Sequence, residues 1–169
     1  MTARRNPGLR HENSSCCGRQ PDAKEIAVEA AGLDRFEDIT LQIFRYFFQA
    51  FACPQSQGWV HALEVARSAC GEHGASVAHK VLDAMRAVRT TRTSTFMFNS
   101  PSCPGCAAIL SEHERRLMSA LASIRRGRVA PAQLELMMLC EGNDVSGAIS
   151  AFMALSDAMP DPLPAETGL

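Results

Sequence analysis

The sequence lacks any uninterrupted apolar run that is long enough to cross a bilayer. About 18 consecutive apolar residues are needed for that, and the two longest apolar stretches, at residues 43–48 and 134–139, are broken by Arg45 and Glu135. Residues 1–22 contain arginines but lack the apolar segment of a secretory signal peptide. We therefore expect no membrane segment and a cytoplasmic location, where thiols stay reduced.

Several enzyme motifs are also missing. Glu112-His113-Glu114 is not followed by a second histidine at the spacing that a zinc protease requires. The chain has no G-x-S-x-G nucleophile elbow and no glycine-rich phosphate loop. Because no acid–base group accompanies the cysteines in the sequence, we favour a non-enzymatic role over catalysis.

Length and composition predict one globular domain with flexible ends. The chain has 169 residues, of which 46% are hydrophobic and 21% charged, as in ordinary globular proteins. Residues 1–22 are rich in Arg, Asn, Ser, Gly and Pro, which predicts a disordered leader. Residues 23–159 form the predicted helical domain, and residues 160–169 a flexible tail.

Apolar residues recur at the spacing of amphipathic helices through most of the chain. The predicted bundle helices cover residues 36–53, 59–70, 77–88, 104–124, 131–142 and 145–155, and a short helix is expected before them at residues 23–31. No stretch alternates as a strand does, and residues 96–98 are a short extended piece without an evident partner. The pattern predicts an all-α fold, a compact bundle of about five to six helices.

Positive charge is concentrated in one part of a nearly neutral chain. Between residues 86 and 128 there are eight arginines and only two acidic residues, although the net charge is −1. Two arginine clusters stand out: Arg86, Arg89 and Arg92, and Arg125, Arg126 and Arg128. Such clusters indicate contact with an acidic protein or a nucleic acid, and the alternative is a solvated helix face. Neither cluster contains an aromatic residue, so neither offers a stacking platform for single-stranded nucleic acid.

Among the seven cysteines, the pair in Cys103-Pro104-Gly105-Cys106 is the most specific chemical feature. Thiols at this spacing bind metals or form reducible disulfides, and the start of the helix predicted from Pro104 favours the thiolate. Cys53 and Cys140 fall near the ends of other predicted helices. The set Cys53, Cys103, Cys106 and Cys140 therefore predicts a four-thiolate site for an iron–sulfur cluster or zinc. Iron–sulfur is slightly favoured because Cys53 and Cys103 each precede a proline.

Other interpretations of these residues stay open. The C-x-x-C pair alone is consistent with a redox-active dithiol, although the βαβ context of thioredoxin-like proteins is missing. Reduced cysteine also packs as a small hydrophobic residue, which we favour for Cys70, while the two interpretations are balanced for Cys140. We expect the histidines at positions 61, 73, 79 and 113 to be half-buried or at the surface rather than metal ligands.

These observations predict a helical regulator or sensor that responds to metal or redox state through its four cysteines. One alternative is a redox-active C-x-x-C protein. The other is a metal-free helical adaptor that binds a partner through the arginines or an exposed apolar groove. We expect the partner to be a protein, with nucleic acid as the alternative, and the oligomeric state is left open.

Overall fold

The computed structural model describes residues 9–10 and 21–158 of the chain. Its longer helices are α1 (Arg35–Ala52), α2 (Gly58–Cys70), α3 (Gly74–Thr91), α5 (Glu112–Arg125), α6 (Val129–Leu139) and α7 (Ser146–Asp157). The one-turn helix α4 (Pro104–Ala107) precedes α5. The strands are two residues each: β1 (Leu9–Arg10), β2 (Ile26–Ala27), β3 (Phe98–Asn99) and β4 (Ile109–Leu110). The prediction of an all-α bundle is confirmed.

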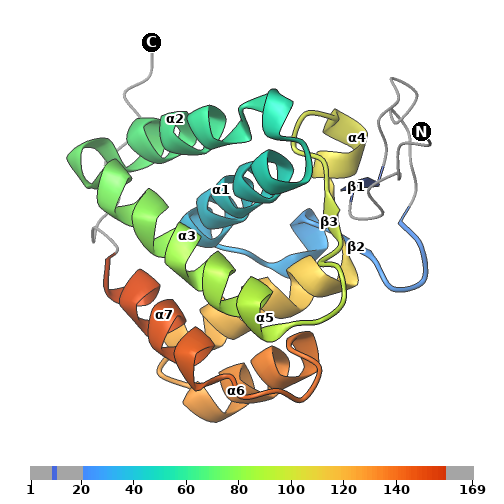
Figure 1. The fold of residues 1–169 in the computed structure, drawn as a ribbon, viewed down its shortest axis with the longest axis vertical. Coiled ribbons are helices and arrows are strands. Elements are labelled where there is room, and N and C mark those ends of the chain that lie inside the picture. Colours follow the sequence, from blue (N-terminus) through green and yellow to red (C-terminus); the bar gives the residue numbers. More distant parts are fainter. Residues whose placement is uncertain (1–8, 11–20, 159–169) are drawn as a thin grey trace.

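Helix α1 lies in the middle of the bundle, with α2, α3 and α5 packed against it (Figure 1). It begins where Asp34 and Glu37 form a capping box, in which each side chain accepts a hydrogen bond from the backbone N–H of the other. It carries the apolar face that the sequence predicts, and Phe36, Ile43 and Phe44 on that face are almost completely buried. The predicted end at Cys53-Pro54 is confirmed, because proline disfavours a helical conformation in the preceding residue.

Helices α2 and α3 meet at a close backbone contact. A Cβ atom added to Gly74 would lie 2.6 Å from the carbonyl oxygen of Ala66, closer than atoms pack. Glycine therefore allows the start of α3 to touch α2, and α3 then packs against α7. The opposite side of the bundle is closed by α5 and α6, which pack against each other.

The predicted helix over residues 104–124 is wrong, because the chain forms α4, β4 and α5 in its place. Ser111 and Glu114 form a second capping box that starts α5 anew at Glu112. Between the helices, β4 pairs antiparallel with β2, so that Ile26 faces Leu110. The apolar spacing of residues 110–124 predicts the helix itself, and the capping box at Ser111 sets where it begins.

Two further local predictions are corrected. Residues 23–31 are not an α-helix, since they contain β2 and a 3-10 turn at Glu29–Ala31. The extended piece at residues 96–98 does have a partner, because β3 pairs parallel with β1 and Phe98 faces Leu9. Strand β1 lies in the predicted leader, and the other predictions for residues 1–8, 11–20 and 159–169 concern residues outside those that the structure describes. No helix in the described ranges is long and apolar enough to cross a membrane.

Candidate binding pocket

The four predicted metal ligands lie at the ends of three separate helices. Cys53 follows α1, Cys140 follows α6, Cys103 caps α4 and Cys106 lies within it. Among residues 9–10 and 21–158, no group of three or more histidine, cysteine, aspartate or glutamate side chains is placed to hold a metal ion. A tetrahedral site needs such a group, so this arrangement gives the four-cysteine site no support. Metal binding stays a prediction.

The surroundings of the single cysteines fit packing better than ligation. Cys140 has no exposed surface, and burial raises the pKa of its thiol, which keeps it protonated. Burial likewise raises the pKa of the Cys70 thiol, and this residue lies in the hydrophobic core, as we favoured from the sequence. Cys53 is half-buried, with its Sγ 3.7 Å from Oε1 of Gln55.

The C-x-x-C pair lies on a single turn of helix. Cys106 is fully buried and Cys103 is half-buried. Because α4 has only four residues, the long helix that the sequence placed behind these thiols is absent, and with it most of the expected dipole. A redox role for this pair stays a prediction.

The histidines lie at the surface or are half-buried, as predicted. His61, His73 and His79 are exposed, beside Glu64, Glu72 and Asp83 respectively. His113 is different, because its Nδ1 accepts a hydrogen bond from the backbone N–H of Met97 at 2.8 Å. Burial and then the charge of Arg92 lower the pKa of His113 from 6.5 to about 4, so the ring is neutral near pH 7.

One arginine of the second cluster, Arg125, is used inside the fold, and the other two are exposed. Arg125 forms ion pairs with Asp34 and Glu37, the latter at 2.9 Å, and thereby ties the end of α5 to the start of α1. Arg126 donates a hydrogen bond to the carbonyl of Ala122 at 3.0 Å. Arg128 is exposed.

The first cluster likewise contains one arginine that is bound within the fold and two exposed ones. The side chain of Arg92 is only 3% exposed and donates hydrogen bonds to the carbonyl of Leu139 and to Oγ of Ser94. It therefore does not belong to a solvated ridge. Arg86 and Arg89 are exposed on α3.

Glu141 fixes the loop that follows α3. Its carboxylate accepts hydrogen bonds from the backbone N–H and hydroxyl groups of Thr93 and Ser94. These bonds, led by that of the Ser94 hydroxyl, lower the pKa of Glu141 to about 2. The residue adopts a left-handed conformation with φ 61°. The loop is thus anchored to the turn between α6 and α7.

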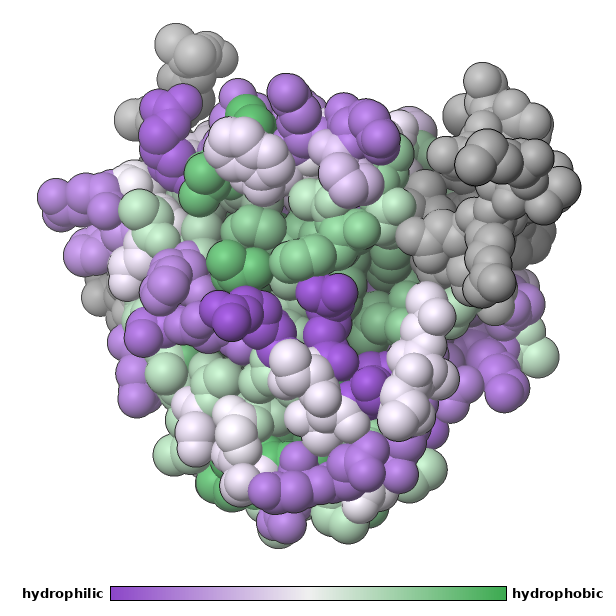
Figure 2. All heavy atoms as spheres, viewed as in Figure 1, coloured by the Kyte–Doolittle hydropathy of each residue, from purple (hydrophilic) through white to green (hydrophobic). Residues whose placement is uncertain are grey.

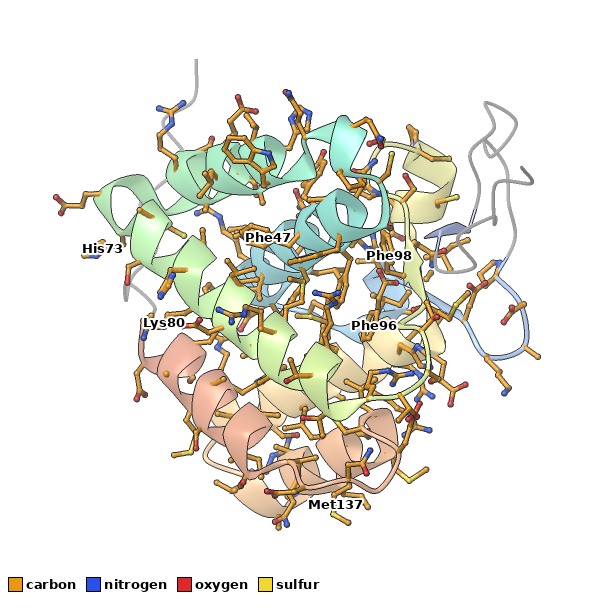
Figure 3. The ribbon with its side chains drawn as sticks, in the orientation of Figure 1. Phe47, His73, Lys80, Phe96, Phe98 and Met137 are labelled. Atoms are coloured by element: carbon orange, nitrogen blue, oxygen red, sulfur yellow. The ribbon has the colours of Figure 1, made fainter. Side chains whose placement is uncertain are left out.

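A cavity of about 270 Å³ opens between the second half of α1, the end of α3 and the anchored loop. Three buried aromatic rings form its floor, and a fourth, half-exposed ring stands at its edge: Phe48, Phe96, Phe98 and Phe51. The rings of Phe48 and Phe96 are stacked, with centroids 4.2 Å apart, and the Phe48 and Phe98 centroids lie 5.6 Å apart. Figure 3 shows Phe96 and Phe98 directed inward from their segment. On the surface, an apolar hollow is bordered by strongly hydrophilic residues (Figure 2).

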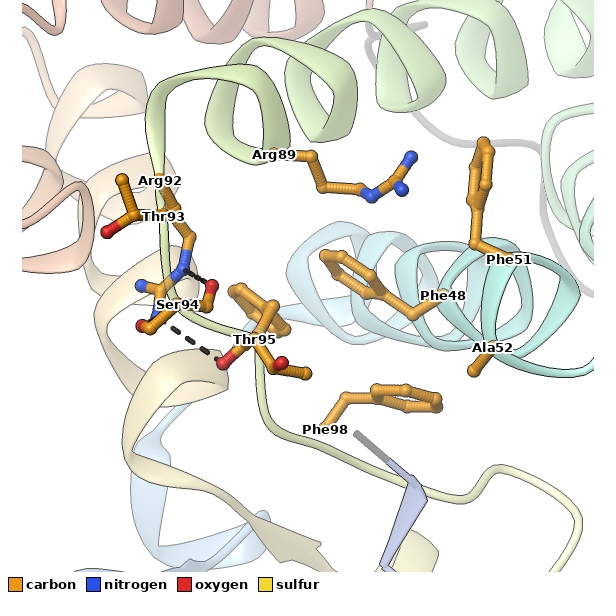
Figure 4. A pocket seen from close by; sticks show the side chains of 10 residues that line it. Phe48, Phe51, Ala52, Arg89, Arg92, Thr93, Ser94, Thr95 and Phe98 are labelled. Carbon is orange, nitrogen blue, oxygen red and sulfur yellow. Dashed lines mark hydrogen bonds between the residues drawn. The ribbon is translucent and has the colours of Figure 1, made fainter. Parts of the chain in front are cut away.

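Arg89 stands at the rim of this cavity (Figure 4). Its guanidinium carbon lies 4.0 Å from the centroid of the Phe51 ring, which is 48% exposed. Arg45, Arg92 and Arg125 differ from Arg89 in that each of them pairs with a carboxylate. In the part of the chain that the structure describes, Arg89 has no such carboxylate. A cation beside an exposed ring is a suitable contact for an anionic group on an apolar body.

A second cavity, of about 260 Å³, contains arginines but suits an anion less well. Arg115, Arg126 and Arg128 contribute to its lining, together with the carboxylate-bearing Glu37. Glu37 places negative charge in the same cavity and lies 3.7 Å from Arg126. The cavity beside Arg89 has no acidic residue in its lining.

Sequence reasoning missed the aromatic neighbours of the arginines. Neither cluster contains an aromatic residue in sequence, yet the fold places Phe51 of α1 against Arg89 of α3. The signal was present in part, because Phe51 lies near the end of an apolar stripe where a helix face often reaches the surface. The sequence alone does not show which other helix lies against Phe51.

The buried pair of Arg45 and Glu114 was missed altogether. In the sequence, Arg45 interrupts an apolar run and Glu114 belongs to an incomplete zinc-protease motif, and neither pattern points to the other residue. In the structure their side chains are 3% and 1% exposed and form an ion pair at 2.7 Å.

Comparison with known proteins adds no assignment, since no family model, curated protein or solved structure matches the chain.

Proposed function

We propose that this protein is a metal-independent helical adaptor that binds an acidic segment of a partner protein at the cavity beside Arg89. The observation that carries the proposal is the position of this arginine. Its charge has no carboxylate partner within the described residues and lies at the mouth of an aromatic-lined cavity. Anions are drawn to such a site by electrostatic complementarity.

A second exposed arginine favours a segment of chain over a small monovalent anion. Arg86 lies three residues before Arg89, so the two Cα atoms are about 4.5 Å apart along the axis of α3 and their side chains share one side of the helix. Arg86 does not line the cavity. A ligand that uses both cations must therefore extend beyond the cavity, as a peptide with several carboxylates does.

Nucleic acid fits the same surface less well. Its binding depends on several phosphate contacts from lysine and arginine, whereas only two exposed arginines lie here and Asp83 is close to them on α3. The chain as a whole carries a net charge of −1. An acidic protein segment needs fewer cationic contacts.

Titration of the full chain with a fluorescein-labelled acidic peptide, such as Glu-Glu-Trp-Glu-Glu with blocked ends, tests the proposal. We expect saturable binding that weakens with added salt, because the pairs lie at the surface. Arg89→Gln and Arg86→Gln should each reduce the affinity by about threefold or more. The matched control is Arg67→Gln, which removes an exposed charge from α2, beside the opposite end of α3. Equal loss with Arg67→Gln, or loss with Arg128→Gln alone, would contradict this site, as would tighter binding of a DNA or RNA oligonucleotide.

A further inference from the structure

We infer that the cavity beside Arg89 accepts an aromatic side chain of the bound segment, so that the recognised sequence has an aromatic residue next to acidic ones. This inference rests on the proposed adaptor function and specifies its ligand. It follows from the chemistry of the cavity floor, the state of its polar groups and its size.

The floor of the cavity is aromatic, and the Phe51 ring at its edge is the most exposed of the four rings. The rings of Phe48 and Phe96 are nearly parallel, with an interplanar angle of 8°, and the Phe98 ring lies at 26° to Phe48. The Phe51 ring stands at the edge, partly exposed, with Arg89 over one face (Figure 4). Aromatic rings pack favourably against such surfaces in offset or tilted arrangements.

Most polar side chains of the cavity wall are already used, and the exposed Thr95 hydroxyl is the exception among those that the structure describes. The hydroxyl groups of Thr93 and Ser94 donate to the carboxylate of Glu141. The guanidinium of Arg92 is bound to Ser94 and to the carbonyl of Leu139. A hydroxylated or sugar-like ligand would have to displace these bonds, whereas an apolar ring needs none of them. The exposed guanidinium of Arg89 remains for a carboxylate beside the ring.

The size of the cavity fits one side chain. Cavities that hold drug-sized molecules or cofactors measure roughly 300–1,000 Å³, and this one measures about 270 Å³. A single aromatic side chain fits within such a space, and burying one large apolar anchor is how protein interfaces commonly gain affinity. The neighbouring carboxylates of the segment would then lie against Arg89 and Arg86 outside the cavity.

The experiment compares two blocked peptides, Glu-Glu-Trp-Glu-Glu and Glu-Glu-Ala-Glu-Glu, by calorimetry with the full chain. We expect the tryptophan peptide to bind about tenfold or more tightly, the difference that burial of a large side chain gives. Phe51→Ala should remove most of this difference, and it should leave the fold intact because Phe51 is half-exposed. The matched control is Val129→Gln, which removes an exposed apolar side chain from the start of α6, about 15 Å along the helix axis from Leu139, whose carbonyl is bound by Arg92 of the cavity wall.

Each other outcome has a definite meaning. If both peptides bind equally and Arg89→Gln weakens both, the aromatic anchor is refuted and the acidic adaptor stands. If neither peptide binds at concentrations up to about 1 mM, both proposals fail. If indole-3-propionate, which combines one ring with one carboxylate, binds as tightly as the tryptophan peptide, the cavity is a small-molecule site and the inference about a protein segment is overturned.

Discussion

Arg45 and Glu114 form a two-point ion pair inside the protein. Nε of Arg45 lies 2.7 Å from one carboxylate oxygen of Glu114, and Nη2 lies 3.1 Å from the other. The same guanidinium donates to the carbonyls of Ala107 and Ile109, each at 2.6 Å. Glu114 also accepts from the backbone N–H of Asn99 at 3.1 Å. This pair of side chains therefore provides hydrogen-bond partners for the irregular backbone between α4 and α5. It also joins that backbone to α1.

Removal of the carboxylate should be strongly destabilising. In Glu114→Ala the buried guanidinium of Arg45 loses its counter-ion, and breaking a buried pair in this way costs about 3–5 kcal/mol. Urea unfolding followed by circular dichroism measures the change. The matched control is Lys24→Ala, which removes the exposed pair of Lys24 and Glu112, 3.6 Å apart, and should change stability by less than about 1 kcal/mol. A Glu114→Ala loss as small as that of the control would mean that water reaches the pair.

The two glycines Gly74 and Gly147 should respond in opposite directions to alanine. The added Cβ in Gly74→Ala would meet backbone atoms of Ala66 and Arg67 within 2.7 Å, so α2 and α3 must separate. Such overpacking costs about 1–3 kcal/mol. Gly147 lies in α7 with nothing within 4 Å of a new Cβ, so Gly147→Ala should gain up to about 1 kcal/mol from helix propensity. Thermal melts of the two variants distinguish these signs, and equal shifts would refute the close contact.

The sequence predicts a helix well where the apolar periodicity and a helix-breaking residue indicate the same boundary. The pattern from Phe36 to Phe51 is predicted to end near Cys53-Pro54, and α1 ends at Ala52 with Cys53 as its C-cap. Residues 104–124 were predicted as one helix because the apolar spacing runs from Leu110 onward and Pro104 is a typical helix start. The interruption depends on β2 and on Arg45, which lie far away in sequence.

The functional predictions depended on contacts that periodicity does not give. The idea of a joint cysteine site required three helix ends to meet, and helix assignments alone do not say which ends meet. The pair of Arg89 and Phe51 is similar, because the sequence places Arg89 in a predicted arginine cluster and Phe51 in the apolar stripe of another helix, without showing that the two meet. Of the six arginines in the two predicted clusters, Arg92 and Arg125 are bound within the fold. Their carboxylate partners are distant in sequence, so the sequence alone does not show that these two side chains are occupied.

His113 should make stability depend on pH between about 6.5 and 4. The folded protein lowers the pKa of this histidine to about 4, while the unfolded chain binds the proton near 6.5. In that window the unfolded state binds more protons, so stability is fully present above pH 6.5 and falls as the pH is lowered toward 4. NMR titration of the imidazole gives the pKa directly.

Substitution of His113 isolates its share of this pH dependence. His113→Gln has no titrating group and keeps a side-chain oxygen that can accept from Met97, so part of the loss between pH 6.5 and pH 4.5 should disappear. His73→Gln is the control, because His73 is exposed and its side chain is 55% accessible. A measured pKa for His113 near 6.5 would show that the ring is open to water and would refute the prediction.

We expect the effect of a serine substitution on stability to depend on how deeply each cysteine is buried, rather than to be equal for all four cysteines. If they formed a metal site, serine at any of positions 53, 103, 106 or 140 would remove the metal and destabilise the protein to a similar degree. The structure leads us to expect little change in stability for Cys53→Ser, since Cys53 is half-buried at the end of α1. Cys140→Ser should lose about 1–3 kcal/mol, because it places a hydroxyl group in a fully buried position. Urea unfolding with and without EDTA, together with elemental analysis of anaerobically purified protein, makes the comparison. Stoichiometric iron or zinc that is lost in all four variants would reinstate the four-cysteine site, because only shared coordination would make these separated residues behave alike.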